Sequence, residues 1–151
     1  MDCKATATLH PEHADERHDD AIPSNRRHTD MTTGIAAEKK TLSQPNEVRT
    51  FEKGRLELVD IGGGTVGRLT LEPGWKWSLH VKPAAGTELC EAPHFQYHAS
   101  GVLHILMADG TAFDAHPGDI TALPSGHDAW VVGDETVVLI DWNGASNYAK
   151  T

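Results

Sequence analysis

Long hydrophobic runs are missing from this sequence of 151 residues. No stretch approaches the roughly 20 apolar residues that a membrane-spanning helix needs, and the N-terminal region has no apolar segment of about 7–15 residues typical of a secretory signal. Cysteine is scarce, with 2 in the chain, which excludes a disulfide framework and favours a reducing compartment. We therefore expect a cytoplasmic protein with no membrane partner.

Positive charge is also in short supply. The chain carries 13 Lys and Arg against 22 Asp and Glu, for a formal net charge of -9. Binding to nucleic acid requires clustered positive charge facing the phosphate backbone, so no nucleic-acid partner is expected. Hydrophobic residues make up 38%, which is enough to form a core over part of the chain, and the length suits one domain.

The first 45 residues differ in composition from the rest. Residues 1–45 are polar and histidine-rich, with few large apolar side chains. Such a segment buries too little surface to offset the entropy lost on ordering, so it is predicted to be a disordered tail. His10, His13 and His18 are spaced like a metal clamp, but nothing fixes their geometry, and a solvated tail is the favoured interpretation. Residues 46–151 then form the folded domain.

Short runs rich in Val, Ile, Leu, Trp and Thr follow, separated by Gly, Pro and Asp. They predict strands at Arg55–Asp60, Val66–Leu71, Trp77–Val81, His94–Ser100, Val102–Met107, Thr111–Ala115, Asp119–Leu123, Asp128–Val132 and Thr136–Asp141. Asp109-Gly110 predicts a two-residue hairpin turn, because both residues favour positive φ. Only residues 31–42 carry a weak helical pattern. Many short strands without helices between them indicate an antiparallel sandwich or barrel.

Three histidines lie at the ends of predicted strands. His80 ends one strand, and His94 and His127 open two others. A barrel can bring such ends together in its interior, so all three are candidate metal ligands, and a histidine that only packs in the core is the alternative for each. Cys90 lies in the loop before His94, where its thiolate could reach the same ion. The alternative for Cys90 is a small buried side chain.

Strand alternation adds candidate substrate-binding residues. Every second side chain of a strand points to the same face, so His94, Gln96 and His98 share one. Gln96 and His98 are therefore candidates for contacting a substrate beside the metal. Lys82 is a candidate for holding an anionic group at the pocket mouth, with an exposed lysine as the alternative. Asp128 is a candidate acceptor for a ligand imidazole, although neighbouring strand residues point in opposite directions.

The spacing of glycine and proline resembles the cupin family, whose domain is a small double-sheet jelly roll. The first cupin motif begins with Gly, five residues and His, and it ends with Glu, six residues and Gly. Here Gly74 is followed by five residues and His80, and His94 is followed by six residues and Gly101.

The second cupin motif reads Gly, five residues, Pro-x-Gly, two residues and His. Here Gly118 is followed by five residues and then Pro124-Ser125-Gly126. The strings PGWKWSLHVKP, CEAPH, DGT and PSGHDAWVVGDE are similar to a group of small bacterial single-domain cupins. The resemblance covers nearly all of residues 46–151.

The ligand positions depart from the family pattern. Lys82 stands where the motif has its second His, and His94 stands where it has Glu. His127 follows Gly126 immediately, two positions before the usual place, which Ala129 occupies. A bulge at Gly126 could absorb that shift of register.

The resemblance implies an all-β jelly-roll (double-stranded β-helix) cupin barrel with a metal pocket, and a homodimer. If His80, Cys90, His94 and His127 all bind, mixed nitrogen and sulfur ligation favours Zn²⁺. If Cys90 stays out, three histidines leave an open position that suits Fe²⁺, Mn²⁺, Ni²⁺ or a catalytic Zn²⁺.

Three functions are consistent with these residues. The first is a metal-dependent enzyme, an oxygenase, isomerase or lyase, acting on a small organic molecule. The second is a metal-containing module that binds or senses a small molecule without turnover. The third is a structural cupin whose histidines only pack.

Overall fold

The computed structural model describes residues 36–148. The predicted tail therefore lies outside the described residues up to position 35. The described chain forms strands and three short helical turns, in the order β1 (Glu47–Phe51), β2 (Gly54–Ile61), β3 (Gly64–Leu71), α1 (Trp77–His80), α2 (Lys82–Ala85), β4 (His94–Ser100), β5 (Val102–Met107), β6 (Ala112–Ala115), β7 (Ile120–Leu123), β8 (His127–Val132), β9 (Val137–Asn143) and the 3-10 turn η1 (Ala145–Asn147).

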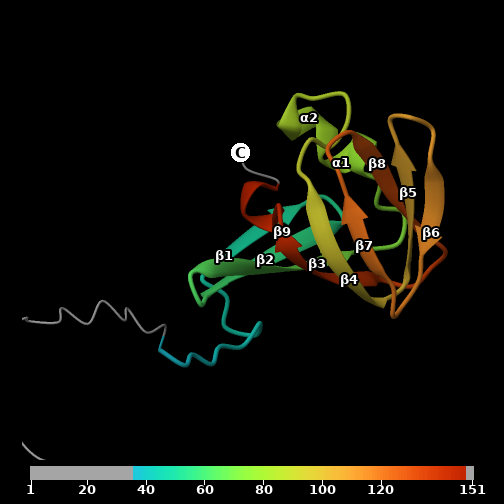
Figure 1. The fold of residues 1–151 in the computed structure, drawn as a ribbon. Coiled ribbons are helices and arrows are strands. Elements are labelled where there is room, and N and C mark those ends of the chain that lie inside the picture. The colour runs from blue at the N-terminus through green and yellow to red at the C-terminus, as the bar shows by residue number, and fades with distance from the viewer. Residues whose placement is uncertain (1–35, 149–151) are drawn as a thin grey trace, which may run out of the picture. The chain divides into compact units, whose positions relative to one another are not determined.

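Two antiparallel sheets enclose the core (Figure 1). The larger sheet has six strands in the order β1-β2-β3-β9-β4-β7, and the smaller has three in the order β6-β5-β8. Both α1 and α2 lie near one end of the roll (Figure 1). The arrangement confirms the predicted all-β jelly roll. Its interior is filled by apolar side chains from both sheets, among them Leu56, Leu69, Leu71, Leu103, Ile105, Val137 and Leu139.

The hairpin between β5 and β6 is confirmed, but its turn is longer than predicted. The N–H of Met107 donates to the carbonyl of Thr111 at 2.8 Å, so three residues connect the two strands. Gly110 has a φ of 88°, whereas Asp109 is not among the described residues with positive φ. A type I turn followed by a left-handed glycine is the usual form of such a three-residue loop.

The strand predicted at Trp77–Val81 is wrong. The N–H of His80 donates to Lys76 O at 3.0 Å and that of Val81 donates to Trp77 O at 2.9 Å, which is helical bonding. The apolar residues at every second position suggested a strand, but Leu79 is 65% exposed while Trp77 and Val81 are buried. Residues four apart share a helix face, and this spacing decides which side chains enter the core.

Two further predictions differ from the structure. The edge strand β1 was not predicted, because its sequence EVRTF lacks the apolar alternation of a half-buried strand. The helical pattern at residues 31–42 is wrong over residues 36–42, which form no helix. Lys40 there donates to the carbonyl of Asp60 in β2, and Arg68 of β3 donates to Leu42 O at 3.4 Å.

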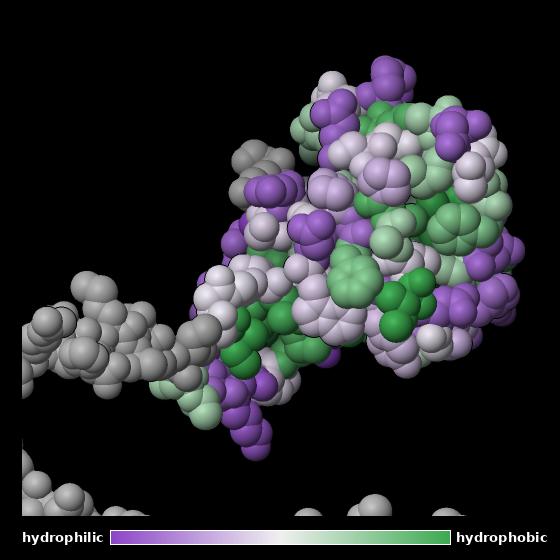
Figure 2. Space-filling view, in the orientation of Figure 1, coloured by the Kyte–Doolittle hydropathy of each residue, from purple (hydrophilic) through white to green (hydrophobic). Residues whose placement is uncertain are grey.

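The outer face of the larger sheet carries several exposed apolar side chains. Phe95 and Trp142 lie with their ring centroids 5.9 Å apart, and Tyr97 is paired with Ile120 across β4 and β7. Figure 2 shows hydrophobic and weakly polar side chains gathered over these strands. Trp142 is 49% exposed, so it does not pack inside the roll.

Between residues 36 and 148, no helix has both the length and the apolar character that crossing a membrane requires.

Substitutions in α1 distinguish the helix from the predicted strand. Val81→Ala is expected to lower the free energy of unfolding by about 1.5–3 kcal/mol, because Val81 is buried and its side chain leaves water on folding. Leu79→Ala is expected to change it by no more than about 0.5 kcal/mol. Denaturant unfolding measures both values. A larger loss for Leu79→Ala than for Val81→Ala would contradict the helix.

Candidate metal centre

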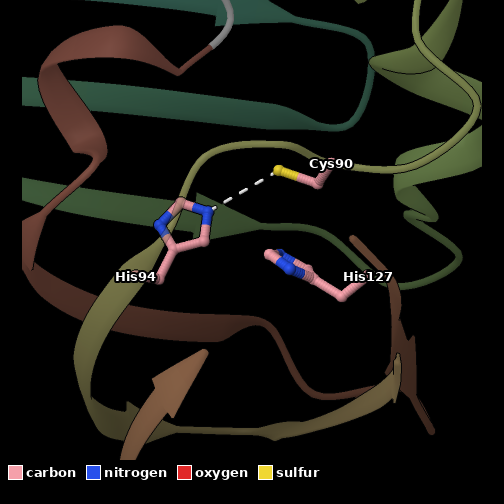
Figure 3. A group of neighbouring side chains, drawn as sticks. All are labelled: Cys90, His94 and His127. Carbon is pink, nitrogen blue, oxygen red and sulfur yellow. Dashed lines mark hydrogen bonds between the residues drawn. The ribbon is translucent and has the colours of Figure 1, made fainter. Parts of the chain in front are cut away.

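Three side chains with metal-binding atoms converge in the interior. Cys90, His94 and His127 each offer one ligand atom, and these atoms all lie within 4.8 Å of one another. Figure 3 shows the thiol and the two imidazoles turned toward a common point. Cys90 Sγ lies 3.7 Å from His94 Nε2, and the His94 and His127 ring centroids are 5.3 Å apart. All three residues are buried.

Main-chain pairing holds the Cys90 loop against the start of β8. The N–H of Cys90 donates to His127 O at 2.8 Å, and the N–H groups of Gly126 and His127 both approach Cys90 O, at 2.7 and 3.3 Å. Gly126 has a φ of 94°. Two consecutive N–H groups that share one acceptor, with a left-handed glycine first, have the geometry of a bulge. This local irregularity turns His127 toward the loop.

Hydrogen bonds orient both imidazoles through the same ring nitrogen. His94 Nδ1 donates to Asp141 Oδ2 at 2.6 Å, and His127 Nδ1 donates to the carbonyl of Pro124 at 3.1 Å. An oxygen acceptor on Nδ1 fixes the tautomer and leaves Nε2 available to a metal. The two rings are therefore oriented as metal binding requires, and a protonated ring would release its Nε2 proton when a metal binds.

Asp141 is fully buried and fully hydrogen-bonded. Its Oδ1 accepts from the N–H of Phe95 at 3.3 Å and from the N–H of Asn143 at 2.9 Å. The β4–β9 register shifts between Phe95 and Gln96, and this shift is where the Asp141 side chain takes the place of a ladder partner. Gly144 is required beside it, because its φ is 95° and a Cβ would lie 1.9 Å from Pro93 O.

The electrostatics of the group favour a thiolate beside an imidazolium. Burial by itself raises the pKa of the Cys90 thiol, but the His127 and His94 rings outweigh burial and lower this pKa to about 6. Burial by itself lowers the pKa of His94, but Asp141 and Cys90 outweigh it and raise that pKa to about 9. Near neutral pH Cys90 is thus already in the form that binds metals.

The donor set fits a divalent transition metal. Tetrahedral zinc with Zn–S of about 2.3 Å and Zn–N of about 2.0–2.1 Å places the sulfur and nitrogen about 3.6 Å apart. The distance between Cys90 Sγ and His94 Nε2 is 3.7 Å. The buried group of Cys90, His94 and His127 could therefore bind a metal ion with little rearrangement.

Two cavities adjoin the group. An interior cavity of about 30 Å³ is lined by the rings of His94 and His127. A cleft of about 220 Å³, walled in part by residues of α1 and α2, reaches Cys90. Trp77 and Tyr148 line both cavities. The group therefore lies where a small interior space and a larger cleft come close together.

Tyr148 reaches this position because the C-terminal segment folds over β3. Arg49 donates to Tyr148 O at 2.5 Å, and a Cβ on Gly67 would lie 2.5 Å from the Cβ of Ala145, so only glycine allows this contact. The Tyr148 ring lies 5.7 Å from that of His94. Burial, together with the charges of Cys90 and Asp128, keeps the pKa of Tyr148 well above its ordinary value, so its hydroxyl stays a neutral donor.

The structure does not place His80 in the group. His80 lies on α1, where its Nδ1 bonds to Lys76 O at 2.9 Å and its Nε2 lies 4.0 Å from Glu52 Oε1. The predicted site assumed a strand that carries His80 inward. Because the segment is a helix, its ring bonds to its own first turn instead.

Of the predicted substrate-binding residues, Gln96 is in the better position. Its side chain is buried and lines the interior cavity, and β4 places it on the same face as His94 and His98, as predicted. His98 is fully buried, and its Nε2 lies 3.0 Å from Thr121 Oγ1. Burial lowers the pKa of His98. Lys82 Nζ donates to Glu88 at 2.6 Å and lines neither cavity.

Sequence reasoning missed Asp141 and Tyr148, and it named Asp128 in place of Asp141. Asp128 Oδ1 accepts from the N–H of Ser78 at 3.1 Å, so it holds α1 rather than an imidazole. Asp141 did leave a signal, because alternation along β9 puts it on the inward face with Val137 and Leu139. Tyr148 left none, since it follows the strands in a short polar stretch.

The sequence and the structure were each compared with those of known proteins. No family model and no curated protein matches the sequence. Among solved structures, a sugar phosphate isomerase of the cupin superfamily from Silicibacter pomeroyi is similar at 21% identity, with a TM-score of 0.50, covering 69% of this chain and 73% of that one. The chain has a cupin fold. A Rhizobium leguminosarum protein of unknown function is also similar, at 19% identity and a TM-score of 0.51, covering 72% of this chain and 99% of that one.

The ionisation of Cys90 is open to a direct test. In metal-free protein carrying Cys3→Ser, Cys90 is the remaining thiol of the 2 in the chain. Its thiolate absorbance is expected to be present at neutral pH and to be lost as the pH falls through about 6. His127→Leu is expected to raise this midpoint toward 9, the ordinary value, because burial then acts with less opposition. A wild-type midpoint near 9 would contradict the coupled group.

Proposed function

We propose that this cupin binds one divalent transition metal through Cys90, His94 and His127 and acts as an enzyme on a small organic molecule. The observation that carries the proposal is the convergence of these ligand atoms within 4.8 Å. Their orientation supports it, because both imidazoles present Nε2 while Nδ1 is held by an oxygen.

Zinc is the metal that the ligand set favours. A thiolate is a soft ligand, and two imidazoles with one thiolate suit Zn²⁺ better than Fe²⁺, Mn²⁺ or Ni²⁺. Three protein ligands leave a fourth tetrahedral position for water or substrate, which is the pattern of catalytic rather than structural zinc. When bound, the metal would supply Lewis acidity at that open position.

The cleft beside Cys90 supports an organic substrate without negative charge. Its volume of about 220 Å³ exceeds the roughly 150 Å³ that accommodates benzene in an engineered cavity. Its walls combine apolar and polar side chains, and its charged groups are Glu91 and the Cys90 thiolate. The lysine expected to hold an anion, Lys82, is paired with Glu88. An anionic substrate is therefore disfavoured, and an oxygenase, isomerase or lyase reaction on a neutral molecule is the proposed activity.

A non-catalytic binding or sensing module is the second candidate. The favouring observation is that the cleft contains one carboxylate, Glu91, which is exposed to solvent and so is poorly suited to act as a general base. Turnover of a bound ligand at saturating metal separates the two functions. The small-molecule ligand, the cytoplasmic location and the homodimer expected from the resemblance stay predictions.

Metal content tests the site directly. Protein purified without a histidine tag is expected to contain about one equivalent of a first-row transition metal, with zinc predominant. His94→Ala is expected to lower this content at least about tenfold, because it removes a ligand together with the imidazole that Asp141 orients. Elemental analysis of dialysed protein measures both.

His80→Ala is the matched control, since His80 bonds within α1, and its metal content is expected to match wild type. Metal bound by the tail histidines would persist in His94→Ala, because the tail is unchanged there. Equal metal content in wild type and His94→Ala therefore rules out this centre.

The role of Cys90 can be separated from that of the histidines. Cys90→Ser is expected to weaken zinc binding at least about tenfold while reducing the affinity for Mn²⁺ or Fe²⁺ less, because a hydroxyl replaces the soft thiolate. Competition with a chromogenic chelator gives the affinities. An unchanged preference among metals would indicate that Cys90 packs in the core and does not bind the metal.

A further inference from the structure

Two of the side chains that line the interior cavity each carry a buried polar atom without a hydrogen-bond partner. Within residues 36–148, the buried side-chain atoms without a hydrogen-bond partner are Trp75 Nε1, Gln96 Oε1 and His98 Nδ1. His98 does not line the cavity, so the first two atoms are the ones considered below. Both side chains line the interior cavity that the His94 and His127 rings also line. Buried polar atoms are nearly always paired, with protein or with ordered water, so each orphan indicates a missing partner.

The two orphans are chemically complementary. The indole N–H of Trp75 can only donate, and the carbonyl oxygen of Gln96 can only accept. One molecule that satisfies both must accept at one point and donate at another. Water does so, whereas dioxygen has no hydrogen to donate to Gln96.

The size of the cavity also suits water. Its volume is about 30 Å³, and one water requires about 10–15 Å³ on this measure. The cavity therefore has room for one or two waters and excludes an organic molecule of the size that the cleft accommodates. Most of the wall is apolar, and the side chains of Trp75, Gln96, His94, His127 and Tyr148 contribute its polar groups.

We propose that this cavity is a built water site, in which Trp75 donates to and Gln96 accepts from an ordered water molecule beside His94 and His127. The inference rests on the proposed function for its use, since water is then the small reactant available at the metal's open position. The organic molecule approaches by the cleft, and the two reactants reach the centre from separate spaces. The site favours chemistry that uses water over chemistry that uses dioxygen.

Water at Trp75 can be detected in solution by nuclear magnetic resonance. In ¹⁵N-labelled full-length protein, the Trp75 indole N–H is expected to show a water cross-peak with the sign of a long-lived buried water. Trp142 is the control, because it is 49% exposed and its contacts with bulk water are too short-lived to give a cross-peak of that sign. Absence of the cross-peak at Trp75 in wild type would overturn the proposal.

Two substitutions at Gln96 sharpen the test. Gln96→Met removes the acceptor at similar size and is expected to reduce the Trp75 cross-peak severalfold, while Gln96→Glu keeps an acceptor and is expected to retain it. An undiminished cross-peak in folded Gln96→Met counts against the site. If that variant fails to fold, the wild-type cross-peak and a crystallographic water bonded to both groups in wild-type protein decide the outcome.

Dissolved oxygen tests whether the cavity takes water in preference to dioxygen. Oxygen is paramagnetic, and under raised oxygen pressure the Trp75 indole signal is expected to broaden less than that of exposed Trp142. Selective broadening of Trp75 would show that dioxygen enters the cavity and would overturn the water site. Zinc content is measured on the same samples so that the two proposals are tested separately. A wild-type protein that binds no metal would contradict the proposed function, whereas the Trp75 cross-peak tests only the water site.

Discussion

The buried carboxylate of Asp141 links the fold to the site. One of its oxygens holds Nδ1 of His94, and the other accepts from two main-chain N–H groups, at Phe95 and Asn143. An ionised carboxylate without partners would be costly in this interior, but one with three donors is well compensated. The β4–β9 pairing is interrupted where this happens, so the sheet gives up regular pairing there in order to fix the orientation of one imidazole.

Much of the fold could be predicted because its determinants are local. The breakers and apolar runs located most strands within one or two residues, and alternation along β4 correctly put His94, Gln96 and His98 on the inward face. The prediction for the segment around α1 was wrong because the spacing of its apolar side chains fits both the two-residue period of a strand and the four-residue spacing of a helix. Trp75, Trp77 and Val81 are buried and Leu79 is exposed, and the sequence pattern alone does not distinguish them.

The site was less accessible to sequence reasoning because its parts meet through pairing of distant segments. His94 and Asp141 are 47 positions apart, and their contact depends on a register shift that leaves no sequence mark. Cys90 was identified from a polar loop, yet it is buried because its main chain bonds to Gly126 and His127. His80 holds the expected motif position, but α1 directs its ring to Lys76 O and not to the group of Cys90, His94 and His127. A ligand inferred from motif spacing thus depends on the local backbone, which here is a helix rather than the expected strand.

The bulge at Gly126 has a consequence for exchange at the centre. Cys90 lies on a loop fastened to β8 by main-chain bonds, while His94 and His127 begin strands of the two sheets. Paired strands generally open at a higher free energy than loops do, and a loop can open by itself. An ion held by all three side chains would therefore enter and leave at the rate at which this loop swings free. Opening of this loop, and not of the strands that carry the histidines, would then set the rate of metal exchange.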